Sequence, residues 1–264
     1  MKKTINGLSV FTSGKQQSKA IIFVHGFPYD HFMWDEQAAE LSEKYFCVTY
    51  DIRGLRESDA SDGQLTMEMF VDDLEKVVDE LKLDKPVLCG LSMGGYISLR
   101  AMERIQDKFS GLILCDTKSD ADDNAGKLKR AAGIKQINFG DFDNFIETFV
   151  QICFSEKFIK EHESEYRDVV NRSKKNNPLG VKGSLLAMAG RTDTTESLSK
   201  FMLPTLVICG SEDKISPPGV MKSLAERIPD SSFVLIEGAG HMTPIEEPKQ
   251  VNSAIKEFLT RNKL

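Results

Sequence analysis

Short apolar runs rich in β-branched residues alternate along the chain with longer stretches of helical periodicity. This alternation predicts an α/β fold, with a mostly parallel central sheet flanked by helices. Asn6-Gly7, between two short apolar segments, predicts an opening hairpin because this dipeptide tolerates the positive φ angles of a tight turn. The remaining strands are expected at Ala20–Val24, Tyr45–Tyr50, Pro86–Cys89, Gly111–Cys115, Thr205–Cys209 and Ser232–Ile236.

Four stretches between these runs predict helices. From Met67 to Leu81 apolar residues recur every three or four positions, so one helix face can pack on the sheet. Met93–Ile105, Pro217–Ile228 and Glu246–Leu259 are also long enough to be helices. A proline suits a helix start, because the first N–H groups of a helix lack intrahelical partners.

Residues 118–200 contain no strand-like run and predict several helices, separated at Gly133, Gly140, Asn177-Pro178 and Gly190. We therefore expect a core formed by residues 1–117 and 201–264, with residues 118–200 inserted as a helical cap. The cap sequence holds 14 basic and 13 acidic residues, and this balance predicts no electrostatic funnel for a charged ligand.

Composition and charge exclude several classes of protein. A chain of 264 residues with 41% hydrophobic and 28% charged residues is typical of a globular protein, and a net charge of −6 disfavours nucleic acid and anionic lipid as partners. The longest apolar run, Ala20–Val24, is far shorter than the ~20 residues of a membrane span or the ~7–15 of a signal-peptide core. We therefore expect no membrane association and a cytoplasmic location.

The five cysteines are odd in number and form no C-x-x-C pair, so neither a metal site nor a disulfide framework is predicted. Cys47, Cys89, Cys115 and Cys209 lie inside short apolar runs, where thiols usually act as small buried hydrophobes.

The segment Gly90-Leu91-Ser92-Met93-Gly94 stands between a predicted strand and a predicted helix. A serine on such a tight turn adopts a strained backbone conformation that raises its hydroxyl above the sheet, and the glycines on both sides prevent clashes. This context favours Ser92 as a nucleophile over the alternative that it only caps the helix.

A serine nucleophile needs a base within hydrogen-bond reach, and the chain has four histidines. His241 follows the last predicted strand in a glycine-rich loop, and it comes after Ser92 in the chain order usual for this arrangement. We expect His162 on a solvated helix face, His25 in a backbone or pocket-lining role, and His31 in a structural or pocket-lining role.

The third member of a triad orients the histidine. Asp213 and Asp116 each follow a predicted strand, at the sheet edge where α/β proteins place their ligands. We prefer Asp213, although Asp116 is geometrically conceivable and Asp213 could simply cap a turn. Glu212 is the weaker choice because its side chain is longer.

Acyl transfer also needs donors aimed at the developing oxyanion. The backbone N–H groups of Met93 and of Phe27, which follows the flexible Gly26, are the candidates. Trp34 and His25 are candidate pocket residues. Arg191 and Asp193 could reach the cleft, but a surface pair is the preferred interpretation.

Taken together, these segments resemble those of the α/β-hydrolases, in the capped esterase and enol-lactonase-like branch. The matching segments are Val24–Pro28, Tyr50–Gly54, the turn around Ser92, Gly210–Pro218 and Gly240-His241. The resemblance implies a Ser92, Asp213 and His241 triad, with Phe27 and Met93 as the oxyanion hole. Because haloalkane dehalogenases and epoxide hydrolases resemble one another in having an aspartate nucleophile, the serine argues against both.

The sequence thus predicts a cofactor-independent serine carboxylic ester hydrolase that acts through an acyl-enzyme on small to medium apolar esters. Two alternatives use the same fold. One is hydrolysis of lactones or of carbon–carbon bonds in diketones by the same triad, and the other is a non-catalytic ligand-binding protein. The oligomeric state is not predicted.

Overall fold

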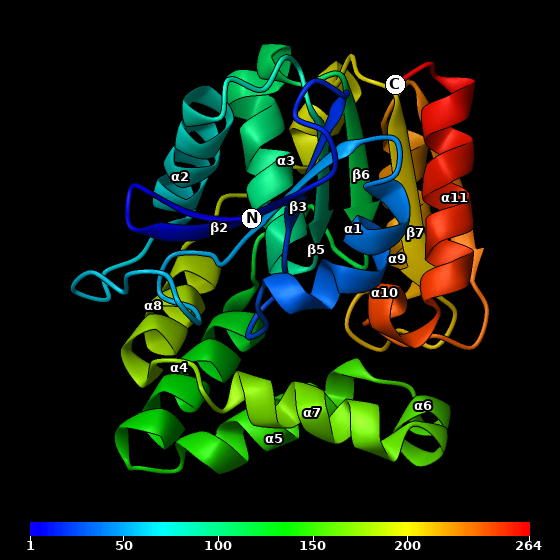
Figure 1. The fold of residues 1–264 in the computed structure, drawn as a ribbon. Coiled ribbons are helices and arrows are strands. Elements are labelled where there is room, and N and C mark those ends of the chain that lie inside the picture. Colours follow the sequence, from blue (N-terminus) through cyan, green and yellow to red (C-terminus); the bar gives the residue numbers. More distant parts are fainter.

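The computed structural model describes residues 1–264, and its centre is an eight-stranded sheet with the order β1-β2-β4-β3-β5-β6-β7-β8 (Figure 1). The pairs β1–β2 and β2–β4 are antiparallel, and all other neighbours are parallel, which confirms the predicted α/β class. The strands are β1 (Lys2–Ile5), β2 (Leu8–Ser13), β3 (Ala20–Val24), β4 (Phe46–Tyr50), β5 (Val87–Leu91), β6 (Gly111–Cys115), β7 (Thr205–Gly210) and β8 (Ser231–Ile236).

The opening hairpin turns at Asn6 and Gly7, whose φ angles of 49° and 79° are both in the left-handed region. This is the geometry that a two-residue turn requires. β3, β4, β5, β6 and β7 are buried along their whole length, as expected for parallel strands covered by helices on both faces.

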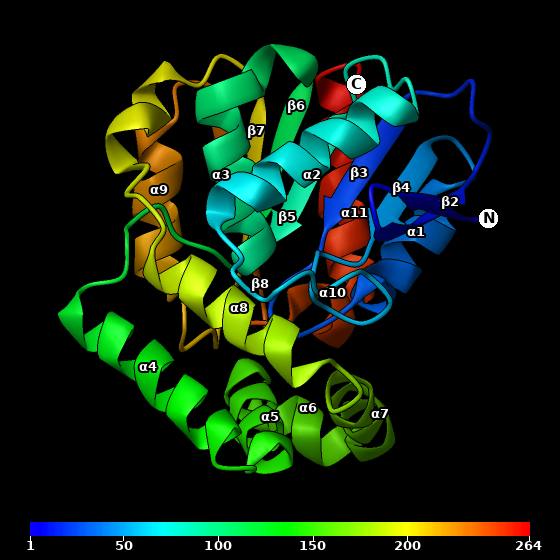
Figure 2. The same ribbon diagram turned by 90° about the vertical axis from the view of Figure 1, so that its left-hand side faces the viewer.

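Helices cover the two faces of the sheet in separate groups. α1 (Asp35–Leu41) packs against α11 (Pro248–Arg261), and α2 (Met67–Glu80) packs against α3 (Met93–Ile105). Figure 2 shows the strands between these two groups. α9 (Pro218–Arg227) packs on β7 and β8, and the short α10 (Thr243–Glu246) packs against α1 and α11.

The helices between β6 and β7 form a layer of their own across the end of the sheet at which the parallel strands terminate (Figure 1). They connect through short turns, and Asn177 caps the last of them by accepting the Leu179 N–H at 2.9 Å. These helices are α4 (Asn124–Asn138), α5 (Phe142–Cys153), α6 (Glu156–Glu161), α7 (Glu163–Ser173) and α8 (Pro178–Ala189).

Two local predictions were wrong. Gly133 does not separate helices but lies inside α4, where a Cβ would stand 2.7 Å from a ring carbon of Phe145, so close packing explains the glycine. The seven-residue α1 was not predicted, because it buries only Gln37 and Leu41 and has no apolar stripe.

All five cysteines are free and buried, and four of them lie within strands, as the sequence predicts. None of the helices has both the length and the apolar character needed to cross a membrane.

Candidate active site

Ser92 stands at the turn between β5 and α3 with φ 53° and ψ −113°, a conformation that non-glycine residues rarely adopt. Its N–H donates to the carbonyl of Cys115 at 3.0 Å, which fixes the turn against β6. A Cβ on Gly94 would overlap the carbonyl oxygens of Val24 and His25, so only glycine permits this approach. Ser92 is partly exposed, and this strand-to-helix turn, the elbow, has the backbone strain expected from the sequence.

His241 and Asp213 are brought together from two loops at the carboxyl edge of the sheet. Asp213 follows β7 and His241 follows β8, and His241 Nδ1 lies 2.9 Å from Asp213 Oδ2. Both side chains are buried. The other ring nitrogen of His241, Nε2, has no hydrogen-bond partner within the protein, and no hydrogen bond joins this ring to Ser92 Oγ.

The carboxylate of Asp213 is held in its charged form. Burial by itself would raise the pKa of Asp213, but the His241 charge and hydrogen bonds from His241 and Ser216 outweigh burial and lower the pKa to about 2. The carboxylate accepts the N–H groups of Ile215 at 2.8 Å and Ser216 at 3.1 Å. It is therefore a charged partner for His241 at neutral pH.

Ser216 is a site residue that the sequence analysis missed. Its hydroxyl donates to Asp213 Oδ2 at 2.6 Å and lies 3.3 Å from His241 Nδ1. A serine three residues after an acidic candidate, in a loop that turns back on itself, is the signal that could have indicated this contact.

Asp116 follows β6 and contacts the same region but not the histidine. Its Oδ1 accepts the Gly210 N–H at 2.8 Å, and its Oδ2 accepts the Thr243 hydroxyl. Burial, together with the nearby charge of Asp213, raises the pKa of Asp116 well above its ordinary value. Of the two candidate acids, only Asp213 is hydrogen-bonded to His241, whereas Asp116 is buried against Gly210 and Thr243. Glu212 faces solvent.

Asp116, Cys209 and Asp213 also offer three potential ligand atoms within 4.8 Å of one another. Burial raises the pKa of the Cys209 thiol as well as that of Asp116, and a raised pKa disfavours the ionised forms that bind a cation.

The loop after β3 lies against the elbow. A Cβ on Gly26 would stand 3.3 Å from the Cβ of Ser92, so the glycine permits the close approach. The N–H groups of Phe27 and Met93 donate no hydrogen bond within the protein. Both N–H groups therefore remain free in the two segments that flank Ser92. The ring of Phe27 packs against Phe149 of α5 at a centroid distance of 5.1 Å.

Trp34 and His25, the candidate pocket residues, are both completely buried. Trp34 packs on Phe23 with ring centroids 5.2 Å apart. His25 has its Nδ1 2.8 Å from the Gly26 carbonyl oxygen and accepts the Ile52 N–H through Nε2 at 2.9 Å. Neither side chain lines one of the larger pockets of the protein, and His25 instead ties two loops together.

The other two histidines also lie outside the elbow. His31 is buried, stacks on Phe11 at 3.6 Å and lies 2.7 Å from Asp51 Oδ1. His162 is largely exposed, between α6 and α7, and its Nδ1 lies 3.3 Å from Glu165. Both match the structural roles expected for them.

The expected surface pair of Arg191 and Asp193 was wrong. Arg191 is buried, donates to Asp122 Oδ1 at 2.8 Å and stacks on the ring of Tyr96 at 4.1 Å. Asp193 instead accepts the Thr195 N–H at 2.8 Å. Spacing along the chain could not show that Asp122, from a distant segment, forms an ion pair with Arg191.

A second missed residue is Glu246, whose buried carboxylate accepts the Ser155 N–H at 2.9 Å and the Met242 N–H at 3.1 Å. Beside it, the N–H of His241 donates to the carbonyl of Cys153 at 2.8 Å. The junction between α5 and α6 therefore holds the loop that carries His241.

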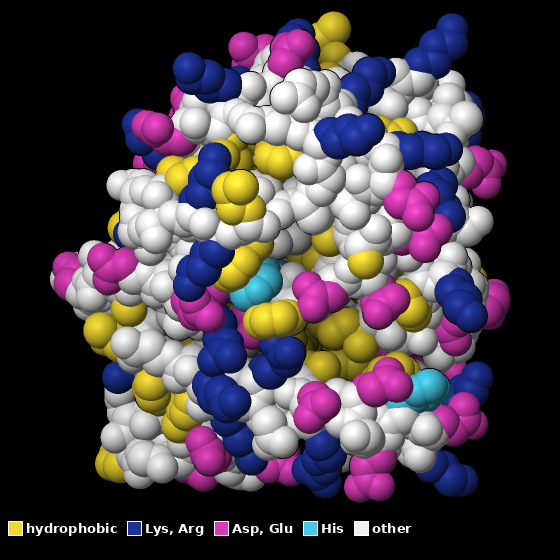
Figure 3. Space-filling model, viewed as in Figure 1, with side chains coloured by type: hydrophobic (Ala, Val, Ile, Leu, Met, Phe, Trp, Pro, Cys, Tyr) yellow, Lys and Arg dark blue, Asp and Glu magenta, His cyan; other side chains and the backbone are white.

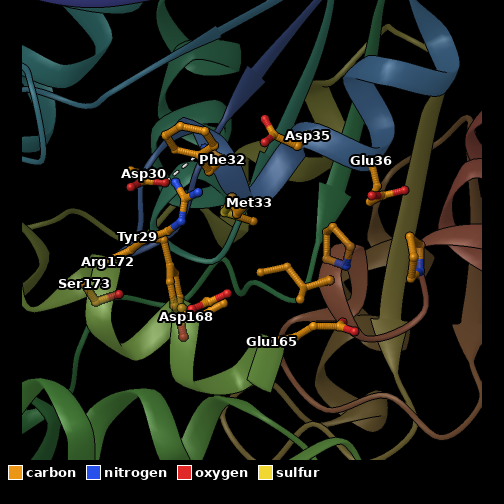
Figure 4. Close-up of a pocket in the computed structure, with 14 residues that line it drawn as sticks. Tyr29, Asp30, Phe32, Met33, Asp35, Glu36, Glu165, Asp168, Arg172 and Ser173 are labelled. Carbon is orange, nitrogen blue, oxygen red and sulfur yellow. Dashed lines mark hydrogen bonds between the residues drawn. The ribbon is translucent and has the colours of Figure 1, made fainter. Parts of the chain in front are cut away.

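A groove of about 320 Å³ lies next to these loops, between α7 on one side and the segment from Tyr29 to Glu36 on the other (Figure 4). None of Ser92, Asp213 and His241 lines it. Figure 3 shows it as a hollow with an apolar interior and acidic side chains around its rim.

A parallel sheet covered by helices, with a serine on a strand–helix turn and a charged aspartate–histidine pair at the same edge, defines the α/β-hydrolase class. Residues 19–248 match the family described as alpha/beta hydrolase fold, and the chain belongs to this family. It is 27% identical to 3-oxoadipate enol-lactonase 1 of Acinetobacter baylyi over 243 residues, which cover 92% of this chain and 89% of that protein.

Among solved structures, a thermophilic esterase from Thermogutta terrifontis is 34% identical, with a TM-score of 0.93 and coverage of 99% of this chain and 98% of that one. The enol-lactonase from Burkholderia xenovorans LB400 shares the fold, with a TM-score of 0.90 at 23% identity and coverage of 98% and 100%. The chain is thus a hydrolase of the α/β fold.

Proposed function

We propose that this protein is a serine carboxylic ester hydrolase that works through an acyl-enzyme intermediate. The observation that carries the proposal is the buried Asp213–His241 pair, at 2.9 Å, on the sheet edge where Ser92 stands on its strained turn. The esterase likeness, at 34% identity over nearly the whole chain, supports the same chemistry.

In this mechanism Ser92 Oγ attacks the ester carbonyl while His241 Nε2 accepts its proton. The N–H groups of Phe27 and Met93, which have no partner in the protein, donate hydrogen bonds to the oxyanion. His241 then returns the proton to the leaving alcohol, and water repeats the sequence to release the acid. Asp213 keeps the Nδ1 proton of His241 in place and stabilises the imidazolium.

Lactone hydrolysis is the second candidate, because the relative from Acinetobacter baylyi is named as an enol-lactonase. The same attack, proton transfer and oxyanion stabilisation open a lactone ring, and the alcohol then remains attached to the acyl group. Substrate shape rather than the triad separates the two reactions.

The test is p-nitrophenol release from short-chain and medium-chain esters by wild type and by Ser92→Ala. We expect turnover in wild type and a loss of about 10³-fold or more in the variant. Mass spectrometry after reaction with a p-nitrophenyl phosphonate should find the label on Ser92. Ser184→Ala, which removes a buried hydroxyl in α8, is the control and should keep wild-type turnover. Unchanged turnover in Ser92→Ala would refute the mechanism, and turnover of lactones alone would favour the second candidate.

A further inference from the structure

The groove beside the site is built from two parts of the chain that are distant in sequence. Its upper wall is the segment from Tyr29 to Glu36, which belongs to the core, and its lower wall is α7 (Figure 4). Met33, Val169 and Ile245 give it an apolar interior. A volume of about 320 Å³ is enough for a small organic molecule.

Four carboxylates stand around this interior. Asp35 and Glu36 come from the start of α1, and Glu165 and Asp168 come from α7 on the opposite wall (Figure 4). None of the four forms an ion pair with a lysine or arginine, and Glu165 has only His162 as a partner, at 3.3 Å. Their charge is therefore available to a ligand.

The remaining charged groups at the groove do not cancel this charge. Asp30 pairs with Arg56, which lies outside the groove, at 3.2 Å. Arg172 is the one basic residue of the lining, and its guanidinium carbon stacks 3.6 Å from the ring centre of Phe32. Burial raises the pKa of Asp35, and Asp30 and Glu36 add to this increase against the opposing influence of His31 and Arg172.

The balanced charge of the cap sequence does not describe the groove, because core residues also line it. Folding places two cap carboxylates opposite two core carboxylates, and Arg172 is the one basic residue of the cap that accompanies them. The result is an apolar hollow with a negative rim, which complements an apolar molecule that carries a positive charge.

The groove is separated from the elbow by two residues in contact. The N–H of Gly26 donates to Met33 Sδ at 3.3 Å, and Gly26 packs directly on Ser92. On the other side, Pro244 and Ile245 line the groove only three and four residues after His241. These contacts place the groove next to the elbow, on the side of the loops that carry Gly26 and His241.

We propose that this groove receives the alcohol portion of the ester and selects alcohols with an ammonium group over neutral ones, and neutral ones over carboxylates. The proposal rests on the ester hydrolysis proposed above and specifies its substrate class. The proposal also predicts that 3-oxoadipate enol-lactone is a poor substrate of this protein, because the acidic rim would repel its carboxylate.

The test compares three butyrate esters with alcohols of similar size: choline butyrate, the isosteric ester in which carbon replaces the ammonium nitrogen, and the ester of a short hydroxy acid. At low ionic strength we expect kcat/KM to fall about 10-fold from the cationic to the neutral ester and further for the anionic one. Because salt screens charge, the cationic preference should shrink at high ionic strength.

The double variant Glu165→Gln/Asp168→Asn should reduce the ratio of cationic to neutral kcat/KM by at least about 3-fold, with little change for the neutral ester. The control Glu163→Gln/Glu226→Gln removes the same charge at two exposed positions outside the groove and should leave the ratio unchanged. Calorimetry measures the binding of benzyltrimethylammonium to Ser92→Ala. The affinity should fall by a similar factor when Glu165→Gln and Asp168→Asn are combined with Ser92→Ala in one chain.

A ratio near one in wild type, or an equal ratio in wild type and the double variant, overturns the assignment of the groove while ester hydrolysis stands. Absence of turnover with all three esters overturns the proposed function itself. A preference for the anionic ester reverses the predicted selectivity and also overturns the assignment.

Discussion

Glu246 and Ser155 are joined by a hydrogen bond of 2.9 Å from the serine N–H to the glutamate carboxylate, across the boundary between the core and the α4–α8 layer. The same carboxylate accepts the N–H of Met242, the residue after His241. The position of the histidine loop is therefore coupled to the α5–α6 junction, through a side chain that does not touch Ser92 or Asp213. Glu246 is a positioning residue in this arrangement.

We predict that Glu246→Gln lowers kcat about 10-fold with little change in KM and lowers the free energy of unfolding by about 1–3 kcal/mol. Each carboxylate oxygen accepts a hydrogen bond from a backbone N–H group. The NH₂ group of a glutamine would therefore face one of these two backbone N–H groups, donor against donor. Steady-state kinetics and urea denaturation measure the two effects. The pH at which kcat is half-maximal should also shift, because His241 is displaced relative to Asp213.

Glu247→Gln is the matched control for this prediction. It removes the same charge one position along the chain, where the carboxylate contacts only the Gln250 side chain at 3.0 Å. We expect wild-type kcat and stability. If both variants behave alike, Glu246 does not position the loop.

Asp213→Asn should reduce kcat by about 10³–10⁴-fold, because an amide cannot hold the Nδ1 proton of His241 or stabilise the imidazolium. The low pKa of Asp213 also gives a pH signature. A carboxylate whose pKa falls from 3.8 to about 2 on folding stabilises the native state above pH 3.8, and this stability is lost as the pH falls toward 2. The variant should therefore lose less stability than wild type between pH 5 and 3 in urea unfolding.

Asp116→Asn should behave in the opposite way. Burial raises the pKa of Asp116, so the folded protein holds a proton that the unfolded chain releases, and stability falls as the pH rises above 3.8. An amide keeps the acceptor for the Gly210 N–H at 2.8 Å and does not ionise. We expect kcat within about 3-fold of wild type and a smaller loss of stability between pH 5 and 8. A kcat as low as that of Asp213→Asn would make Asp116 the functional acid.

Much of the fold could be predicted because its strands β3 to β7 are fully buried. A parallel strand covered on both faces is apolar throughout, as in Ala20–Val24, and such runs stand out in any sequence. The elbow could be predicted for a related reason. Ser92 needs glycines at positions where a Cβ would overlap neighbouring backbone, and this requirement leaves a visible pattern.

Contacts between distant segments could not be predicted in this way. Glu246 follows His241 by five residues and reads as an ordinary helix residue, until Ser155 is placed beside it. Arg191 likewise gives no sign that Asp122 will pair with it in a buried site. The acidic rim of the groove depends on the same kind of meeting, because α1 and α7 each contribute two of its carboxylates. Such contacts are properties of the packed chain and not of local sequence.

The final prediction concerns the seating of α8 on the core. Gly180 of α8 packs against Gly54 in the loop after β4, and a Cβ on Gly180 would overlap the Gly54 carbonyl. Gly180→Ala must therefore move α8 away from the core or distort the loop, and overpacking of this kind costs about 1–3 kcal/mol. Because the α4–α8 layer covers the site, we expect a raised KM and a changed preference for acyl chain length, besides a lower urea midpoint.

Gly190→Ala tests whether this effect is specific to the Gly54 contact. Gly190 caps the other end of α8, where a Cβ would meet only the Leu186 carbonyl at 3.4 Å. We expect a change in the free energy of unfolding within about 0.5 kcal/mol and an unchanged KM. If the two variants shift KM equally, the specificity change comes from the helix as a whole. If only Gly180→Ala shifts KM, the close approach of two backbone segments sets the depth of the ester site.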